Sequence, residues 1–210
     1  MSEFFKFQNF LSLKKKKRVI LIDNFDSFTF NIVDFLKISG AEVDIFRNDI
    51  FLEDIFPQKY DLLLISPGPG VPKTAGNLMK IIDFCVKKIP IFGICLGHEA
   101  IAEFFGGNLK FLKPVHGKSC EIFCDQKTIF QNLPKKFLAG RYHSLAINKI
   151  PPDFEISAKT ADNEIMAIRH KKLPIESVQF HPESILTMHE NCGEKILKNI
   201  LQVLIPNFSK

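Results

Sequence analysis

The feature that most constrains the fold is an alternation of short apolar runs with segments at helical spacing in the first half of the chain. The apolar runs are residues 18–23, 41–47, 61–65 and 90–94, and the helical segments are 26–38, 75–87 and 96–105. Runs rich in Val, Ile and Leu are typical of strands buried on both faces. Strands joined through helices lie parallel in one sheet, so the pattern predicts an α/β fold with a mostly parallel central sheet flanked by helices.

After Gly107 the pattern changes to short apolar runs separated by turns. These runs are 109–112, 116–124, 137–140, 145–147, 154–159 and 164–170. They predict a smaller, strand-rich antiparallel portion. A further strand at 175–180 and an amphipathic helix at 190–204 complete the predicted α/β chain.

The charge of the chain is concentrated at its beginning. Of 210 residues with a net charge of +5, residues 1–18 carry six basic side chains and one acidic one, so residues 19–210 are neutral. We therefore predict a basic, Phe-rich N-terminal arm at 1–17 and a single domain at 18–210. A neutral body gives no reason to expect nucleic-acid binding, and no run of 18 apolar residues predicts a membrane span.

The five cysteines do not form a disulfide framework. Their number is odd and they are scattered through a chain long enough to build its own core, which favours a reducing compartment and hence the cytoplasm. His116, Cys120 and Cys124 resemble part of a metal site, but no second ligand pair follows at zinc spacing. The sequence therefore predicts no metal.

One corner of the chain has the spacing of a catalytic nucleophile. Gly93 and Gly97 stand two positions either side of Cys95, which gives G-x-C-x-G, a nucleophile elbow with cysteine in the serine position. Glycine suits a sharp strand-to-helix turn, where backbones approach closely. At the start of a helix the free N–H groups favour thiolate, and the N–H of Leu96 could form half of an oxyanion hole. The alternative interpretation of Cys95 is a buried structural cysteine.

A second chemical group follows the last predicted strand, in His181-Pro182-Glu183. Proline keeps the preceding residue extended, and in an extended chain residues two apart point the same way, so Glu183 can reach the imidazole of His181. A thiol nucleophile needs a base, and the base needs a group that orients it. Cys95, His181 and Glu183 supply these roles, whereas a surface histidine is the alternative for His181.

The turn-rich segment SPGPG follows the third predicted strand, whose carboxyl end should lie near Cys95. Pro-Gly pairs are common turn signals in any protein. Its position nevertheless makes the N–H of Gly68 a candidate for the second oxyanion donor.

Seven segments together resemble the class I, triad-type glutamine amidotransferases. They are IDNFDSFTFN (22–31), ISPGPGVP (65–72), GICLGHEAIAEFFGG (93–107), HGK (116–118), GRYHSL (140–145), EIMAIRH (164–170) and VQFHPESILT (178–187). The match covers residues 18 to about 205. Within that family the chain resembles the glutamine subunits of anthranilate synthase and of aminodeoxychorismate synthase.

The resemblance implies a reaction and its residues. Cys95 would attack the side-chain amide of glutamine, His181 would move the protons, and Glu183 would orient His181. The resulting γ-glutamyl thioester would be released as glutamate. The resemblance also assigns the substrate-binding positions: Gly68 and Leu96 to the oxyanion, and Gly70, residue 99, Ser144 and Leu145 to the amino-acid end.

The resemblance further implies a partner, because 210 residues leave no room for a fused synthase. Ammonia would pass to a separate chorismate-binding subunit, and Mg²⁺ is expected on that subunit, with no cofactor in this chain. One residue departs from the family, which usually has glutamine where this chain has Glu99. If Glu99 faces the carboxylate of glutamine it weakens binding, and if it faces the ammonium it strengthens binding. We expect a modest penalty with the enzyme still active.

Three alternatives stay open at this point. The product could be aminodeoxychorismate, for folate biosynthesis, in place of anthranilate, for tryptophan biosynthesis, or the same chain could serve both. The chain could be an impaired subunit that keeps its partner while Glu99 spoils glutamine binding, although Cys95, His181 and Glu183 are intact. It could also be a hydrolase or peptidase on a related fold, for which the segments 22–31 and 140–145 are unexpected.

Overall fold

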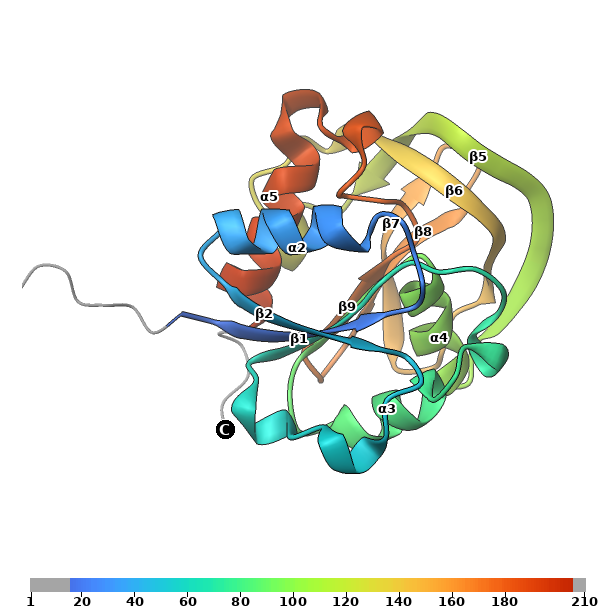
Figure 1. The fold of residues 1–210 in the computed structure, drawn as a ribbon. Helices are drawn as coiled ribbons and strands as arrows, with labels where there is room; N and C mark the ends of the chain where they lie inside the picture. The colour runs from blue at the N-terminus through green and yellow to red at the C-terminus, as the bar shows by residue number, and fades with distance from the viewer. Residues whose placement is uncertain (1–15, 206–210) are drawn as a thin grey trace, which may run out of the picture.

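A nine-stranded sheet organises the protein in the computed structural model, which describes residues 16–205 (Figure 1). The strand order is β2-β1-β3-β4-β9-β8-β7-β5-β6. The strands are β1 (Arg18–Asp23), β2 (Glu42–Arg47), β3 (Leu62–Ile65), β4 (Ile91–Ile94), β5 (Asn108–Cys124), β6 (Lys136–Lys149), β7 (Phe154–Thr160), β8 (Ile165–His170) and β9 (Ile175–Val178). The α-helices are α2 (Thr29–Ile38), α3 (Leu78–Cys85), α4 (Leu96–Phe104) and α5 (Cys192–Asn199).

The two halves of the strand order differ in direction. Neighbouring strands from β2 to β9 pair in parallel, and those from β9 to β6 pair antiparallel. The predicted α/β class is therefore confirmed, and the antiparallel strands extend the same sheet. Because β4 and β9 are parallel neighbours, with Ile94 opposite Val178, the segments that follow them begin at the same edge.

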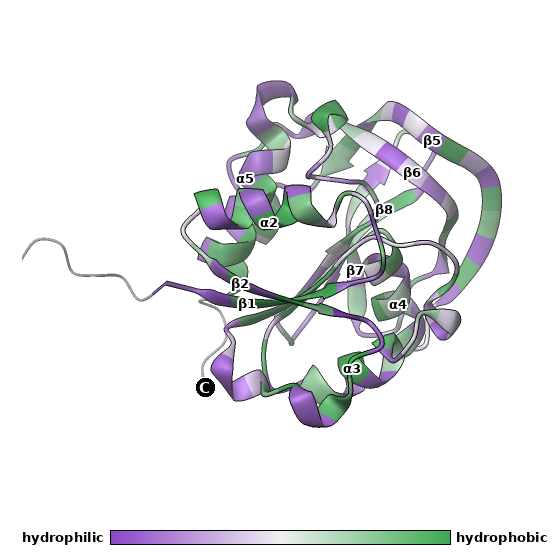
Figure 2. Ribbon diagram, viewed as in Figure 1, coloured by the Kyte–Doolittle hydropathy of each residue, from purple (hydrophilic) through white to green (hydrophobic). Residues whose placement is uncertain are grey.

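The helices cover both faces of the parallel half, as the alternation predicts (Figure 1). Apolar residues of α2 and α5 share one core with Val19 and Leu21. Residues of α3 and α4 share the other core with Ile20 and Ile22. Successive residues of a strand point to opposite faces, and helices cover both faces here. The central strands are therefore apolar along most of their length (Figure 2).

Two predicted helices are shorter than expected. Residues 26–28 form a turn before α2, in which Asp26 Oδ1 accepts from the N–H of Phe28 at 2.8 Å and Asp23 Oδ1 accepts from Thr29 Oγ1 at 2.7 Å. The predicted cap at Asp26 or Ser27 is therefore wrong, since Phe28 occupies the N-cap position. Helix α3 begins only at Leu78 because Gly76, with φ +56°, interrupts the chain before it.

Four of the predicted short strands merge into two long ones. β5 contains the runs 109–112 and 116–124, and β6 contains 137–140 and 145–147. Register shifts between Phe111 and Val115 and between His116 and Lys118 accommodate Pro114 and Gly117, the latter at φ +64°. The predicted last helix also divides, since α5 continues as one π-helical segment over Ile200–Leu204.

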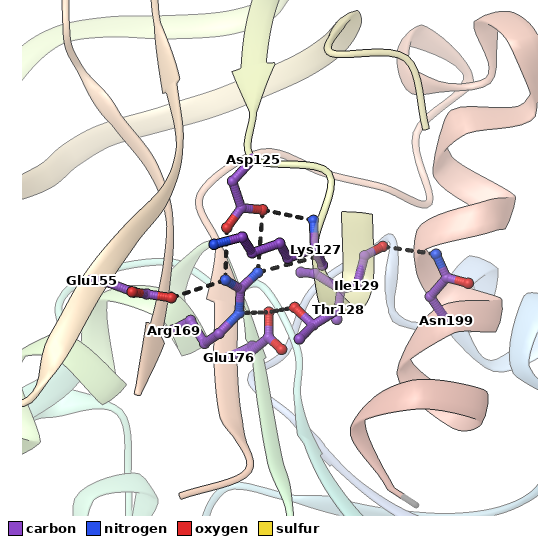
Figure 3. A network of polar contacts seen from close by, with 8 residues as sticks. All are labelled: Asp125, Lys127, Thr128, Ile129, Glu155, Arg169, Glu176 and Asn199. Atoms are coloured by element: carbon purple, nitrogen blue, oxygen red, sulfur yellow. Dashed lines mark hydrogen bonds and ion pairs between the residues drawn. The ribbon is translucent and has the colours of Figure 1, made fainter. Parts of the chain in front are cut away.

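A buried ion network pins the loop that links β5 to β6 (Figure 3). Arg169 in β8 contacts three carboxylates: Asp125 at 2.7 Å, Glu155 at 3.0 Å and Glu176 at 3.1 Å. Thr128 donates to Glu176 at 2.8 Å, and Asn199 in α5 donates to the carbonyl oxygens of Ile129 and Gln131. The loop is thereby held against both β9 and α5.

The predicted arm at 1–17 lies outside the described residues apart from Lys16 and Lys17. The carbonyl oxygen of Lys17 accepts from the N–H of Glu42 at 2.8 Å, which extends the pairing of β1 with β2. None of the helices within residues 16–205 is long and apolar enough to cross a membrane.

Candidate active site

Cys95 stands on a strained corner between β4 and α4. Its φ is +52° and its ψ is −104°, a conformation that L-residues rarely adopt. Two backbone bonds hold it there, from the N–H of Cys95 to the oxygen of Val178 at 2.9 Å and from the N–H of Glu99 to the oxygen of Cys95 at 3.0 Å. The corner has the geometry of a nucleophile elbow, as the spacing predicted.

The flanking glycines are required by close approach. A Cβ on Gly93 would lie 2.5 Å from the backbone of Gly97, and a Cβ on Gly97 would lie 2.6 Å from the carbonyl oxygen of Ile65. No side chain fits at either position without displacing backbone. The G-x-C-x-G pattern therefore reflects the packing of α4 against β3 and β4.

The protonation of Cys95 differs from the prediction. The start of α4 was expected to favour thiolate, but the pKa of the Cys95 thiol is raised well above its ordinary value. Burial is the main cause, because Cys95 is 6% exposed, and the carboxylates of Glu99, Glu183 and Asp26 add to it. The N–H of Leu96 lowers the pKa without compensating for these effects. Cys95 is therefore a thiol in this environment, and it needs a base.

His181 and Glu183 lie just beyond the end of β9. The His181 Nδ1 and Glu183 Oε1 atoms are 2.6 Å apart, and both side chains are buried. A backbone bond from His181 N–H to the oxygen of Gly140 joins this segment to β6, and the rings of Phe28 and Tyr142 pack edge-on against the imidazole. With Nδ1 engaged by Glu183, His181 Nε2 has no partner among the described residues.

A small polar cavity opens on one side of Cys95, with a volume of about 140 Å³. It is lined by Gly68, Pro69, Gly70, Cys95, Glu99, Tyr142, His143, Ser144 and Leu145. Five of the six predicted substrate-binding residues thus surround one space. Leu96, the sixth, is not in this lining, but its N–H begins α4 beside Cys95.

Gly68 and Leu96, the two residues predicted to bind the oxyanion, are close neighbours. A Cβ on Gly68 would be 2.9 Å from Cδ2 of Leu96 and 2.4 Å from Cβ of Asn24, so Gly68 is wedged between these two residues. Asn24 anchors the loop through its N–H to Ser66 Oγ and its amide to the Ser66 oxygen, both at 2.9 Å. Asn48 in turn donates to Asn24 Oδ1 at 3.0 Å. The SPGPG loop is therefore held rigidly against the elbow.

A second cavity, of about 370 Å³, adjoins the first at Cys95. It is lined by Phe25, Asp26, Ser27, Phe28, Pro67, Gly68, Pro69, Cys95, His116, Tyr142 and His181. Most of this lining comes from the loop after β1 and from aromatic side chains. Gly68, Pro69, Cys95 and Tyr142 line both cavities, so the polar space and the more aromatic one adjoin at the elbow.

Glu99 faces the polar cavity from the first turn of α4. It is 3% exposed and its Oε1 accepts from Gln179 Nε2 at 3.0 Å. Burial raises the pKa of Glu99 to about 7, against the hydrogen bond from Gln179, which lowers it. The departure from the family pattern therefore lies within the candidate site.

Sequence reasoning missed Gln179 and Tyr142. Gln179 Nε2 is 3.9 Å from the sulfur of Cys95, and Tyr142 lines both cavities. The signal for Gln179 was its place in the short segment between the end of β9 and His181. Nothing comparable in the sequence distinguishes Tyr142, which depends on how β6 folds over the site.

Metal ligands are not grouped in the part of the chain that the structure describes. No set of three His, Cys, Asp or Glu side chains is placed to hold an ion there. His116 instead packs its ring against Tyr142, and Cys120 accepts a long contact from Arg141 at 3.8 Å.

Two solved structures share the fold of this chain. A protein from Thermoplasma acidophilum described as a putative GMP synthase component has a TM-score of 0.79 and 28% identity, covering 90% of this chain and 94% of that one. A glutamine amidotransferase from Thermotoga maritima has a TM-score of 0.73 at 18% identity, over 90% and 96% of the two chains, which shows the fold alone.

Curated relatives match over nearly their full length. Anthranilate synthase component 2 of Methanocaldococcus jannaschii is 47% identical over 193 residues, covering 89% of this chain and 97% of the relative. Aminodeoxychorismate/anthranilate synthase component 2 of Bacillus subtilis is 46% identical over 188 residues, covering 88% and 95%. The sequence profile described as glutamine amidotransferase class-I matches residues 20–202. With its elbow, its histidine and its glutamate in that order, the chain belongs to the class-I glutamine amidotransferase family.

Proposed function

We propose that this chain is the glutamine-hydrolysing component of anthranilate synthase and supplies ammonia to a separate chorismate-using subunit. Support comes from relatives named anthranilate synthase component 2, which match the chain across 97% of their length at 47% identity. The Bacillus subtilis relative carries both the anthranilate and the aminodeoxychorismate names. We therefore keep aminodeoxychorismate synthesis, or shared use, as the second candidate. The five cysteines, all free, favour the reducing cytoplasm as its location.

The single observation that carries the reaction is the arrangement of Cys95 and His181 at adjoining strand ends around one cavity. Cys95 Sγ attacks the side-chain amide carbon of glutamine, while His181 Nε2 takes the thiol proton and gives it to the departing ammonia. A C–S bond forms and the C–N bond breaks. Water, deprotonated by His181, then breaks the C–S bond to release glutamate and restore the thiol. Glu183 keeps the Nδ1 side of the imidazole occupied throughout.

The surrounding residues have separate roles in this proposal. The N–H groups of Gly68 and Leu96 bind the oxyanion of each tetrahedral intermediate. Gly70, Glu99, Ser144 and Leu145 hold the amino-acid end of glutamine in the polar cavity. Because the pKa of the Cys95 thiol is raised, His181 acts as a true general base.

The aromatic cavity is the proposed exit for ammonia. Phe25, which lines it, is 52% exposed, so a partner protein could cover both the residue and the opening. Ammonia would then reach the partner without crossing bulk water. In this scheme Mg²⁺ belongs to the chorismate site of the partner, and this chain uses no cofactor.

The test is to purify the chain with the chorismate-using subunit from the same genome and identify the aromatic amine made from chorismate. Glutamine and ammonium salt are supplied in separate reactions. We expect anthranilate from both sources, whereas the Cys95→Ala complex should use ammonium alone. Aminodeoxychorismate as the product would favour the second candidate, and no glutamine use by the wild-type complex would favour an impaired subunit. Hydrolysis of peptides or of other γ-glutamyl compounds in preference to glutamine would favour the hydrolase interpretation.

A further inference from the structure

The amide nitrogen of Gln179 contacts two groups that both gain charge by losing a proton. Gln179 Nε2 is 3.9 Å from Sγ of Cys95 and 3.0 Å from Oε1 of Glu99. An amide nitrogen has two hydrogens, so it can donate to both atoms at once. The nucleophile and the unusual glutamate are therefore linked through one donor.

The orientation of this amide has a cost that needs an explanation. Gln179 is fully buried, and its Oε1 has no hydrogen-bond partner among the described residues. Turning the amide over would place Oε1 against the Glu99 carboxylate, which is an unfavourable contact. In this orientation the amide nitrogen donates to Glu99 and Cys95, and the amide oxygen is left without a hydrogen-bond partner among the described residues.

The charges around Cys95 come from several elements. The titratable groups that face Cys95 or Glu99 are Asp26 in the loop after β1, Glu103 in α4, His181 and Glu183 after β9, and Tyr142, His143 and His116 in the cavity walls. Of these carboxylates, only Glu99 shares a hydrogen-bond donor with Cys95. Ionised Glu99 opposes a negative sulfur, and it stands where the family usually has a neutral glutamine.

We propose that Glu99 and Gln179 set the protonation of Cys95 before glutamine binds, with the Glu99 carboxylate acting against the thiolate and the Gln179 amide acting for it. Gln179 is a positioning residue that acts through Cys95, and Glu99 has this role in addition to holding the amino-acid end of glutamine. This inference rests on the proposed function only in taking Cys95 as the nucleophile. Its consequence is a nucleophile that stays a thiol at neutral pH and is guarded from alkylation and oxidation until glutamine binds.

The size of the effect follows from the two distances. They place Sγ and Oε1 at most about 7 Å apart, where two charges at an effective dielectric constant of about 20 shift each other's pKa by roughly one to two pH units. A thiolate of lower pKa is also a weaker nucleophile, which cancels about half of the gain on a logarithmic scale. Removing the charge of Glu99 should therefore raise the alkylation rate by about 3- to 10-fold near pH 8, where Glu99 is mostly ionised, and by less at pH 7.

The experiment measures alkylation of Cys95 by iodoacetamide between about pH 6 and pH 10, by mass spectrometry of the peptide that carries it. In Glu99→Gln we expect faster alkylation at neutral pH and a midpoint lower by roughly one to two pH units. Glu103→Gln is the matched control, since Glu103 acts on Glu99 but is not among the groups that raise the pKa of the Cys95 thiol. Glu103 also pairs with Lys73 at 3.1 Å and lines neither cavity. Its profile should follow the wild type.

Gln179→Met provides the opposite perturbation, because it keeps the bulk and removes the donor. We expect slower alkylation and a midpoint at higher pH, with melting temperatures recorded for every variant. A folded Glu99→Gln protein with a wild-type profile, or an equal shift in Glu103→Gln, would overturn the proposal. A complex that does not use glutamine, although its alkylation profiles shift as expected, would refute the proposed function and leave this inference standing.

Discussion

The Arg169 network allows a stability prediction whose magnitude depends on pH. Arg169→Met keeps the buried stem and removes the guanidinium from Asp125, Glu155 and Glu176. Glu155 is about half exposed, so losing its ion pair should cost little, whereas the Glu176 side chain is 2% exposed. The perturbation therefore acts mainly on Glu176 and on the two-pronged contact of Arg169 with Asp125.

Glu176 determines how the cost changes with pH. Burial raises the pKa of Glu176 to about 7 although Arg169 and Thr128 lower it, and the pKa in the unfolded chain is about 4.3. A carboxyl group whose pKa is higher in the folded protein contributes stability that is fully present below its pKa in the unfolded chain. This stability is lost as the pH rises through its pKa in the folded protein. Without Arg169 the folded pKa rises further, so the loss continues above pH 7.

Protonation limits the magnitude of this pH-dependent part. Near pH 5.5 Glu176 is mostly protonated with or without Arg169, so the variant loses only the Asp125 contact, about 1.5 kcal/mol. At pH 8 Glu176 is ionised in the folded wild type, which stabilises it by about 1.4 kcal/mol for the one pH unit above its pKa of about 7. The variant does not gain this stabilisation, so the same amount adds to the cost of the substitution. The total of about 3 kcal/mol should lower the melting temperature by roughly 6 to 12 °C.

The assay is urea unfolding of wild type and Arg169→Met at pH 5.5 and pH 8. The control compares the double variant Arg169→Met/Glu176→Gln with Glu176→Gln alone. In this pair the cost of Arg169→Met should not depend on pH, because the titrating carboxyl group is gone. Equal costs at the two pH values in Arg169→Met would refute the reasoning, and so would a pH dependence that survives in the double variant.

Three further predictions concern the site. Gly97→Ala should lower the free energy of unfolding by about 1–3 kcal/mol, since its Cβ would lie 2.6 Å from the oxygen of Ile65, and a melting temperature equal to the wild type would contradict this. Glu183→Ala should reduce glutamine-dependent synthesis by roughly 10²- to 10⁴-fold and leave ammonium-dependent synthesis unchanged, so equal loss of both would remove the orienting role. The isolated chain should hydrolyse glutamine slowly and its partner should accelerate it, a gating effect that equal turnover with and without the partner would exclude.

Local patterns were enough to predict the parallel half of the fold. Most strands there are compact apolar runs, and α2 and α4 end shortly before Gly40 and Gly106, which adopt φ +89° and φ +88°. The long strands β5 and β6 could not be predicted as single elements, because Pro114 and Gly117 break the pattern in the sequence while bulges carry the pairing past them. Whether a strand continues past a bulge depends on its pairing with the neighbouring strand, which the local sequence does not show.

The features of the candidate site likewise divide into those that the local sequence could predict and those that it could not. Cys95, His181 and Glu183 could be placed because their geometry depends on neighbours one or two residues away. The raised pKa of Cys95 could not, since it depends on burial and on Asp26 and Glu183, which tertiary packing brings close. The N–H of Leu96 at the helix start does lower the pKa of the thiol, as local reasoning predicted, but burial and the carboxylates outweigh it.

The most direct test of the central claim is to detect the γ-glutamyl thioester on Cys95. The wild-type complex is mixed with glutamine, quenched in acid during turnover, digested and analysed by mass spectrometry, with Cys95→Ala as the matched control. We expect the peptide that carries Cys95 to gain the mass of one γ-glutamyl group in the wild type, and no other peptide to gain it in either protein. Glutamate formation without this adduct, or an adduct on another residue, would contradict the account.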